Sequence, residues 1–75
     1  MDQGQSKYGI SNIEYNIITT MANLLDGVDV LDRYAQDAEQ AGDTECSTIF
    51  RTIRENNKSS AQQLRNALGR HLNQS

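Results

Sequence analysis

The side chains that could do chemistry are few, and two of them fall at the same end of the expected fold. Glu14 and His71 lie almost the same number of residues before and after Gly42, so a turn at Gly42 would bring them together. A carboxylate and an imidazole are both metal ligands, but one of each rarely forms a site unless a second chain doubles them. Otherwise Glu14 belongs to a helix cap, and His71 is an exposed residue near the negative end of a helix dipole. We expect no metal site and keep Glu14 and His71 as its weak candidates.

Three aspartates, Asp26, Asp29 and Asp32, recur every three residues. They could present one face to a divalent cation. They could also form a solvated acidic face that pairs with the basic residues between positions 51 and 58, which is the usual role of charges repeated along a helix. We favour the solvated face.

Cys46 is the only cysteine, so the chain can form neither an intramolecular disulfide nor a zinc knuckle, and a reducing cytoplasm fits. A thiolate is favoured at a helix N-terminus and could act as a redox sensor. The place of Cys46 on an apolar stripe favours a core thiol instead. Ser, His and Asp all occur, but there is no Gly-x-Ser-x-Gly turn and no His beside a nucleophile. We expect no catalytic set and no enzyme.

The composition indicates a small domain that cannot enclose a core alone. Hydrophobic residues make up 36% of the 75 positions, and the chain contains no Pro and no Trp. A core of this size contributes only a few kcal/mol, so oligomerisation is expected. The net charge of −3 argues against nucleic-acid binding. No stretch approaches the roughly 18 apolar residues of a membrane span, and residues 1–9 lack the apolar region of a signal peptide.

Two long helices must position these residues. Ser11-x-x-Glu14 forms a capping box that begins the first helix, and Gly42 followed by Asp43 predicts a short turn and a second N-cap. We expect a flexible arm over 1–10, a helix over 11–41, a turn at 42–43 and a helix over 44–72. A short turn sets the helices antiparallel. The first helix carries an apolar seam at alternating spacings of four and three: Ile17, Met21, Leu24, Val28, Leu31, Ala35 and Ala38.

The second helix carries a similar seam with a polar middle. Its members are Cys46, Phe50, Ile53, Asn57, Ser60, Leu64, Ala67 and His71. Asn57 and Ser60 could hydrogen-bond each other or a partner helix and fix its register, as a buried Asn does in coiled coils. Gly27 falls opposite Asn57 when both are counted from the turn. Gly27 either allows another helix or a small ligand to approach closely, or makes room for a bulky neighbouring side chain.

The segment from Tyr34 to Leu64 resembles, without a gap, the first helix hairpin of rubrerythrins and related ferritin-like proteins. The matching features are Tyr34, Ala35, Ala38, Gly42, Phe50, Ala61 and Leu64. In that family, a Glu of the first helix and a Glu-x-x-His pair of the second bind iron or manganese. Those positions fall here on Leu24, Asn57 and Ser60. The resemblance therefore implies two hairpins paired as a four-helix bundle, without the family's metals or its di-metal activity.

The sequence thus predicts an all-α, antiparallel two-helix hairpin that pairs as a homodimeric ferritin-like four-helix bundle and acts as a non-catalytic interaction or scaffolding module. We expect no cofactor, no nucleic acid and no membrane partner. One alternative is a metal-binding or oxidoreductase protein with substitute ligands. Another is a small regulator that binds a larger protein through its first helix. The expected interface is Ile17, Met21, Leu24, Val28, Leu31, Phe50, Ile53 and Leu64.

Overall fold

The computed structural model describes residues 9–73, which form two α-helices and no strand. Helix α1 spans Asn12–Gln40 and helix α2 spans Thr44–Asn73. The prediction of an all-α chain is confirmed for this part of the sequence. The expected arm over residues 1–10 lies mostly on residues 1–8, outside the described residues.

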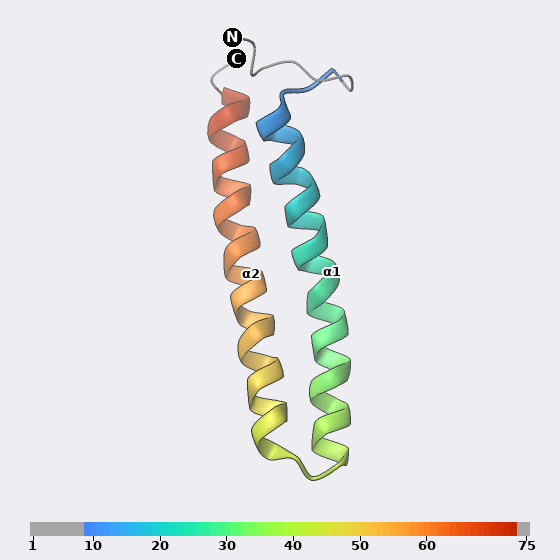
Figure 1. Ribbon diagram of the computed structural model, residues 1–75. Coiled ribbons are helices and arrows are strands. Elements are labelled where there is room, and N and C mark those ends of the chain that lie inside the picture. The colour runs from blue at the N-terminus through green and yellow to red at the C-terminus, as the bar shows by residue number, and fades with distance from the viewer. Residues whose placement is uncertain (1–8, 74–75) are drawn as a thin grey trace.

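The two helices lie side by side and run in opposite directions, joined at one end by a short connection (Figure 1). We call this arrangement the helix pair. It is a rod that measures 54 × 21 × 16 Å. Over the described residues, neither helix is both long and apolar enough to cross a membrane.

Capping side chains set the start of α1. The backbone N–H of Glu14 donates to Ser11 Oγ at 3.1 Å, and the backbone N–H of Ser11 donates to Glu14 Oε1 at 3.4 Å. These two bonds form the predicted capping box, which satisfies amides that have no partner within the helix.

The connection stops one helix and starts the next within three residues. Gly42 adopts a left-handed conformation with φ of 78°, which glycine tolerates without strain. Its N–H donates to Glu39 O at 3.0 Å, and the N–H of Asp43 donates to Ala38 O at 2.8 Å, which is the Schellman pattern. Asp43 Oδ1 then accepts from the N–H of Cys46 at 2.9 Å and caps α2. The turn glycine and the second cap are both as the sequence predicted.

The core between the helices is thin. Among the described residues, the buried apolar side chains are Ile17, Ala35 and Ala61, and the one buried polar side chain is Ser47. Alanine and serine leave little bulk between two helices, so the backbones can approach closely at these levels. Apart from Ile17, the large apolar residues of the α1 seam are only half-buried: Met21, Leu24, Val28 and Leu31.

The face that α2 turns towards α1 differs from the expected seam. Ser47 and Ala61 are buried and Arg54 is half-buried, whereas Ile53 is 42% exposed and Ser60 is exposed. Ile53 and Ser60, which the sequence placed on the seam of α2, therefore do not face α1 within the helix pair. Positions 47, 54 and 61 follow the same seven-residue period as positions 46, 53 and 60. Periodicity alone therefore could not decide which of the two sets faces α1.

Candidate interaction surface

The weak metal candidates do not come together into a site. Glu14 is occupied by its capping box, and His71 is half-buried near the C-terminal end of α2. Within residues 9–73, no three His, Cys, Asp or Glu side chains are grouped closely enough to hold a metal ion.

The acidic face of α1 pairs with basic residues of α2. Arg54 donates to Asp32, and Arg51 lies 2.8 Å from Glu39. The hydrogen bond to Asp32, followed by that to Glu55, raises the pKa of Arg54 above its ordinary value. Asp26 and Asp29 are exposed. Of the three aspartates, Asp32 is thus the one that makes the cross-helix pair the sequence predicted.

Cys46 sits in the first turn of α2, half-buried beside the capping carboxylate. A hydrogen bond to the Asp43 side chain, with partial burial and the charges of Asp43 and Glu45, raises the pKa of the Cys46 thiol. The bond from the Cys46 backbone, together with the bond from its thiol, lowers the pKa of Asp43. A raised pKa leaves less thiolate at neutral pH, so the site suits a structural thiol better than a reactive one.

The polar middle of α2 binds the other helix. Asn57 Nδ2 donates to the backbone carbonyl of Leu24 at 3.2 Å. A Cβ added to Gly27 would lie 2.8 Å from that same nitrogen. Gly27 therefore makes room for the Asn57 amide. Asn57 hydrogen-bonds across the helix pair as predicted, while Ser60 points to solvent.

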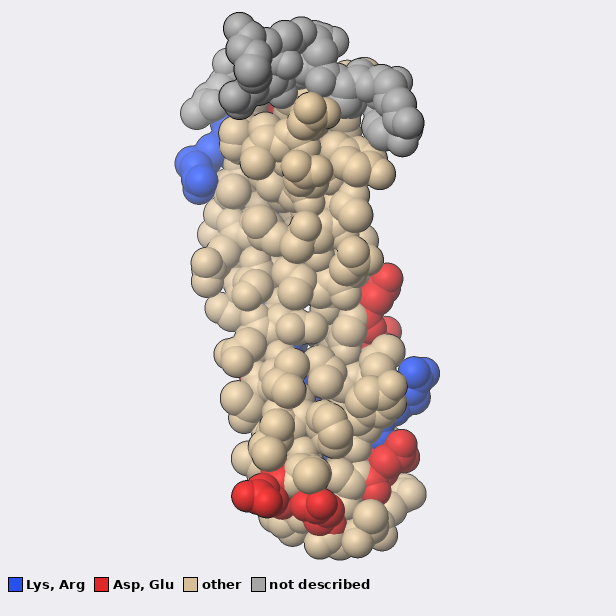
Figure 2. Space-filling model, in the orientation of Figure 1, with Lys and Arg blue, Asp and Glu red and all other residues tan. Residues whose placement is uncertain are grey.

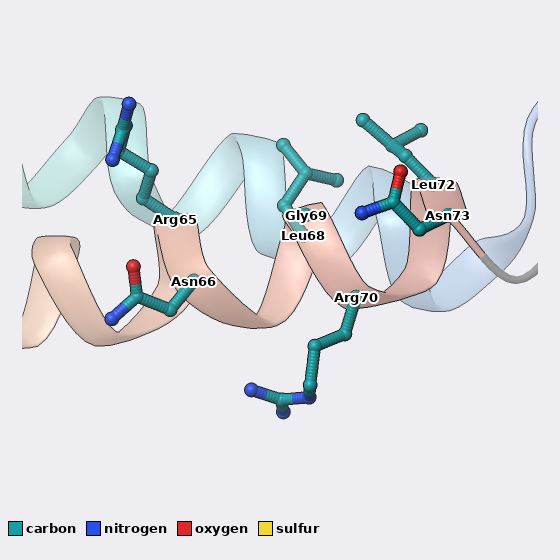
Figure 3. Close-up of a pocket in the computed structure, with 7 residues that line it drawn as sticks. All are labelled: Arg65, Asn66, Leu68, Gly69, Arg70, Leu72 and Asn73. Carbon is teal, nitrogen blue, oxygen red and sulfur yellow. The ribbon is translucent and has the colours of Figure 1, made fainter.

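A shallow hollow lies near the C-terminal end of α2, and Figure 3 shows its lining. All seven lining residues belong to α2, so no second element closes over the space. Arg65, Leu68 and Leu72 point to one side of the helix, and Arg70 points to the other (Figure 3). Side chains that diverge in this way cannot converge on a small substrate.

The largest unexplained feature is the amount of exposed apolar surface. Eight large hydrophobic residues are exposed: Ile13, Tyr15, Ile18, Leu25, Tyr34, Ile49, Ile53 and Leu72. The ring of Tyr34 packs edge-on against Phe50 with centroids 5.7 Å apart, yet Tyr34 remains 47% exposed.

One broad side of the helix pair carries no charge over most of its length (Figure 2). Arg51 and Arg54 form ion pairs with Glu39 and Asp32 of α1. Acidic residues gather at the end of the uncharged side where the turn lies (Figure 2). We call this side the uncharged face.

The expected interface residues divide between the two environments. Ile53 is exposed, and the other seven are buried or half-buried. They are Ile17, Met21, Leu24, Val28, Leu31, Phe50 and Leu64. Contact between these side chains and a second chain stays a prediction.

Searches found no protein-family model, no curated protein and no solved structure that matches this chain.

Proposed function

We propose that this chain is a non-catalytic helical interaction module that works in the cytoplasm. Its antiparallel hairpin self-associates, and two copies form a homodimeric four-helix bundle. This is the arrangement that the resemblance to ferritin-like hairpins implies, without the metal chemistry of that family.

The observation that carries the proposal is the mismatch between the buried core and the exposed apolar surface. Within residues 9–73, Ile17 is the only large apolar side chain that is buried, whereas eight large apolar side chains are exposed. Where exposed apolar residues gather into a patch, they mark an interaction site or an aggregation liability. A second copy would cover part of it and complete a core that two helices cannot enclose.

The state of the reactive groups supports a non-catalytic role. The Cys46 thiol has a raised pKa, and the Asp43 carboxylate is engaged as a helix cap. Glu14 is likewise engaged by the backbone of Ser11. Catalytic groups instead need pKa values poised near the working pH and side chains free to meet a substrate.

Sedimentation equilibrium over a wide concentration range tests the proposal, with metal content measured on the same sample. We expect a dimer mass that falls to the monomer mass only on strong dilution, and no iron or manganese above background. Stoichiometric metal would support the metal-binding alternative and contradict the proposal.

A monomer at every concentration would also contradict self-association. It would favour the regulator alternative, in which the exposed Ile13, Ile18 and Leu25 of α1 bind a larger protein as a helix in a groove. A binding assay with the intact chain as bait would then identify that protein.

A further inference from the structure

Helix α1 carries a second apolar stripe, which lies on its outer surface near its N-terminal end. The members of this stripe are exposed and recur at spacings of three, four and three residues: Tyr15, Ile18, Ala22 and Leu25. At 3.6 residues per turn, the four positions lie within about 80° of the helix circumference. No charged residue occurs from position 15 to position 25. The four side chains therefore form one uncharged apolar strip, which we call the outer stripe.

The outer stripe is distinct from the side of α1 that packs against α2. Ile17 is buried and Met21 and Leu24 are half-buried between the two helices. The centre of the outer stripe lies roughly 110° round α1 from the centre of these three positions. A further helix on the outer stripe would therefore lie nearly at a right angle to α2 as seen from α1. Each helix of a four-helix bundle has two neighbours in such an arrangement.

The spacing of the outer stripe is symmetric about position 20. Tyr15 and Leu25 lie five residues on either side of Thr20, and Ile18 and Ala22 lie two residues on either side. We propose that two copies pair through this stripe, with their α1 helices antiparallel and a two-fold axis at the level of Thr20. Ile18 of each copy then packs against Ala22 of the other, and Tyr15 packs against Leu25. The inference rests on the proposed self-association and adds its surface and its orientation.

The charge nearest the end of the outer stripe agrees with the same axis. Asp29 follows Leu25 by four residues and is exposed on the same side of α1. The two-fold axis places Asp29 at the level of Ser11 of the other copy, which is the N-cap of α1. A helix N-terminus carries a partial positive charge, so a carboxylate beside it is stabilising. Asp26 and Glu14 of the other copy also share a level, but they lie on opposite edges of the contact.

A parallel pairing of the two α1 helices disagrees with these charges. It would set every residue of the stripe level with its own copy, including the three aspartates Asp26, Asp29 and Asp32. Like charges held close together disfavour that orientation. In the antiparallel pairing, the two Asp29 residues are separated by about 27 Å along the helices.

A distance between spin labels tests the orientation and the axis. The label is placed on Gln36→Cys in a Cys46→Ser chain, because Gln36 is exposed on α1 and lies well beyond the outer stripe. The proposed dimer separates the two labelled positions by about 48 Å along the helices. A parallel pairing would bring the labels within about 25 Å, because neighbouring helix axes lie about 8–10 Å apart. A distance in that shorter range would overturn the orientation.

Ile18→Glu and Thr20→Glu test the surface. Both residues are exposed and lie within one turn of α1, but Thr20 is on the opposite side of the helix from the outer stripe. Each variant adds one negative charge, and helix content by circular dichroism should match the parent chain. We expect Ile18→Glu to raise the dimer dissociation constant at least about tenfold, because the apolar contact is lost twice. Thr20→Glu should leave the constant within about threefold. Equal or reversed effects would overturn the surface.

A mixture of two variants tests whether Ile18 faces Ala22 across the axis. Ile18→Glu and Ala22→Lys are made in separate chains, and each alone should dimerise more weakly than the parent. In a mixed dimer the introduced carboxylate and the introduced ammonium meet. At low salt and equal total concentration, the mixture should therefore contain more dimer than either variant alone. No gain on mixing would show that the two positions do not face each other.

The outcomes separate this inference from the proposed function. A monomer mass for the parent chain at every concentration removes the self-association itself. A dimer that tolerates Ile18→Glu as well as Thr20→Glu leaves self-association standing and overturns the outer stripe as its surface. A dimer with the long label distance and a selective effect of Ile18→Glu supports both.

Discussion

At the scale of single residues, the contact between Gly27 and Asn57 makes a sharp prediction. Replacing a mid-helix glycine by alanine usually stabilises a helix by about 1 kcal/mol. In Gly27→Ala the new Cβ would displace the Asn57 amide and cost its bond to Leu24, which is worth about 1 kcal/mol. We expect a net change near zero in the free energy of unfolding, measured by urea denaturation.

Gly69→Ala is the matched control. A Cβ at Gly69 meets nothing within 4 Å, so this variant should gain the full helix-propensity benefit. In an Asn57→Ala background, Gly27→Ala should gain it as well. If Gly27→Ala stabilises the parent chain as much as Gly69→Ala does, the close contact does not exist in solution.

The second residue-scale prediction concerns the reactivity of Cys46. Asp43→Asn keeps a good N-cap residue but removes the carboxylate that raises the thiol pKa. The rate of alkylation by iodoacetamide, followed against pH, should therefore have a lower midpoint in Asp43→Asn than in the parent. An unchanged midpoint would show that Asp43 does not control the thiol.

The lowered carboxyl pKa of Asp43 also leads to a prediction of how the stability of the fold depends on pH. Its carboxyl pKa is lowered in the folded chain below the ordinary value of 3.8. A lowered pKa means that the charged cap stabilises the fold above about pH 4 and that this stabilisation is lost as the pH falls through the folded value. Asp43→Asn has no such group, so its thermal midpoint should fall less than that of the parent between pH 5 and pH 2. Parallel curves for the two proteins would contradict this role.

At the scale of single residues, the sequence was sufficient to predict the helix caps and the turn, because these depend only on neighbouring residues. Ser11, Glu14, Gly42 and Asp43 act within a few residues of their own position, so their types and spacing were sufficient to predict them. The side of the helix pair that Ser60 occupies depends on how α2 rotates against α1. That rotation is a tertiary property, and a heptad pattern with two acceptable seams does not fix it.

At the scale of elements, α2 carries two overlapping seams that share Phe50, Asn57 and Leu64. The seam that faces α1 adds positions 47, 54 and 61, and the seam predicted from the sequence adds positions 46, 53 and 60. The observed choice buries small residues and lets Arg54 reach Asp32. At positions 53 and 60 the second seam stays exposed.

Substituting a larger side chain on α2 tests which of its two seams faces α1. Ala61 is 4% exposed, so Ala61→Leu overpacks the contact with α1 and should destabilise the fold by about 1–3 kcal/mol in urea denaturation. Gln62→Leu is the control, because Gln62 is exposed on α2. It should change the free energy of unfolding by less than about 0.5 kcal/mol. Equal tolerance of both substitutions would mean that α2 is rotated differently from the structure described.

At the scale of the whole molecule, the helix pair exposes more surface than a closed fold of its size. The chain exposes 5481 Å², whereas a compact monomer of 8.4 kDa exposes roughly 4,600 Å². The composition already indicated an incomplete hydrophobic core, since hydrophobic residues are few and their spacing places them on one face of each helix. The sequence left open the surface on which a second copy would sit, because the rotation of α2 against α1 decides which side of α2 stays exposed.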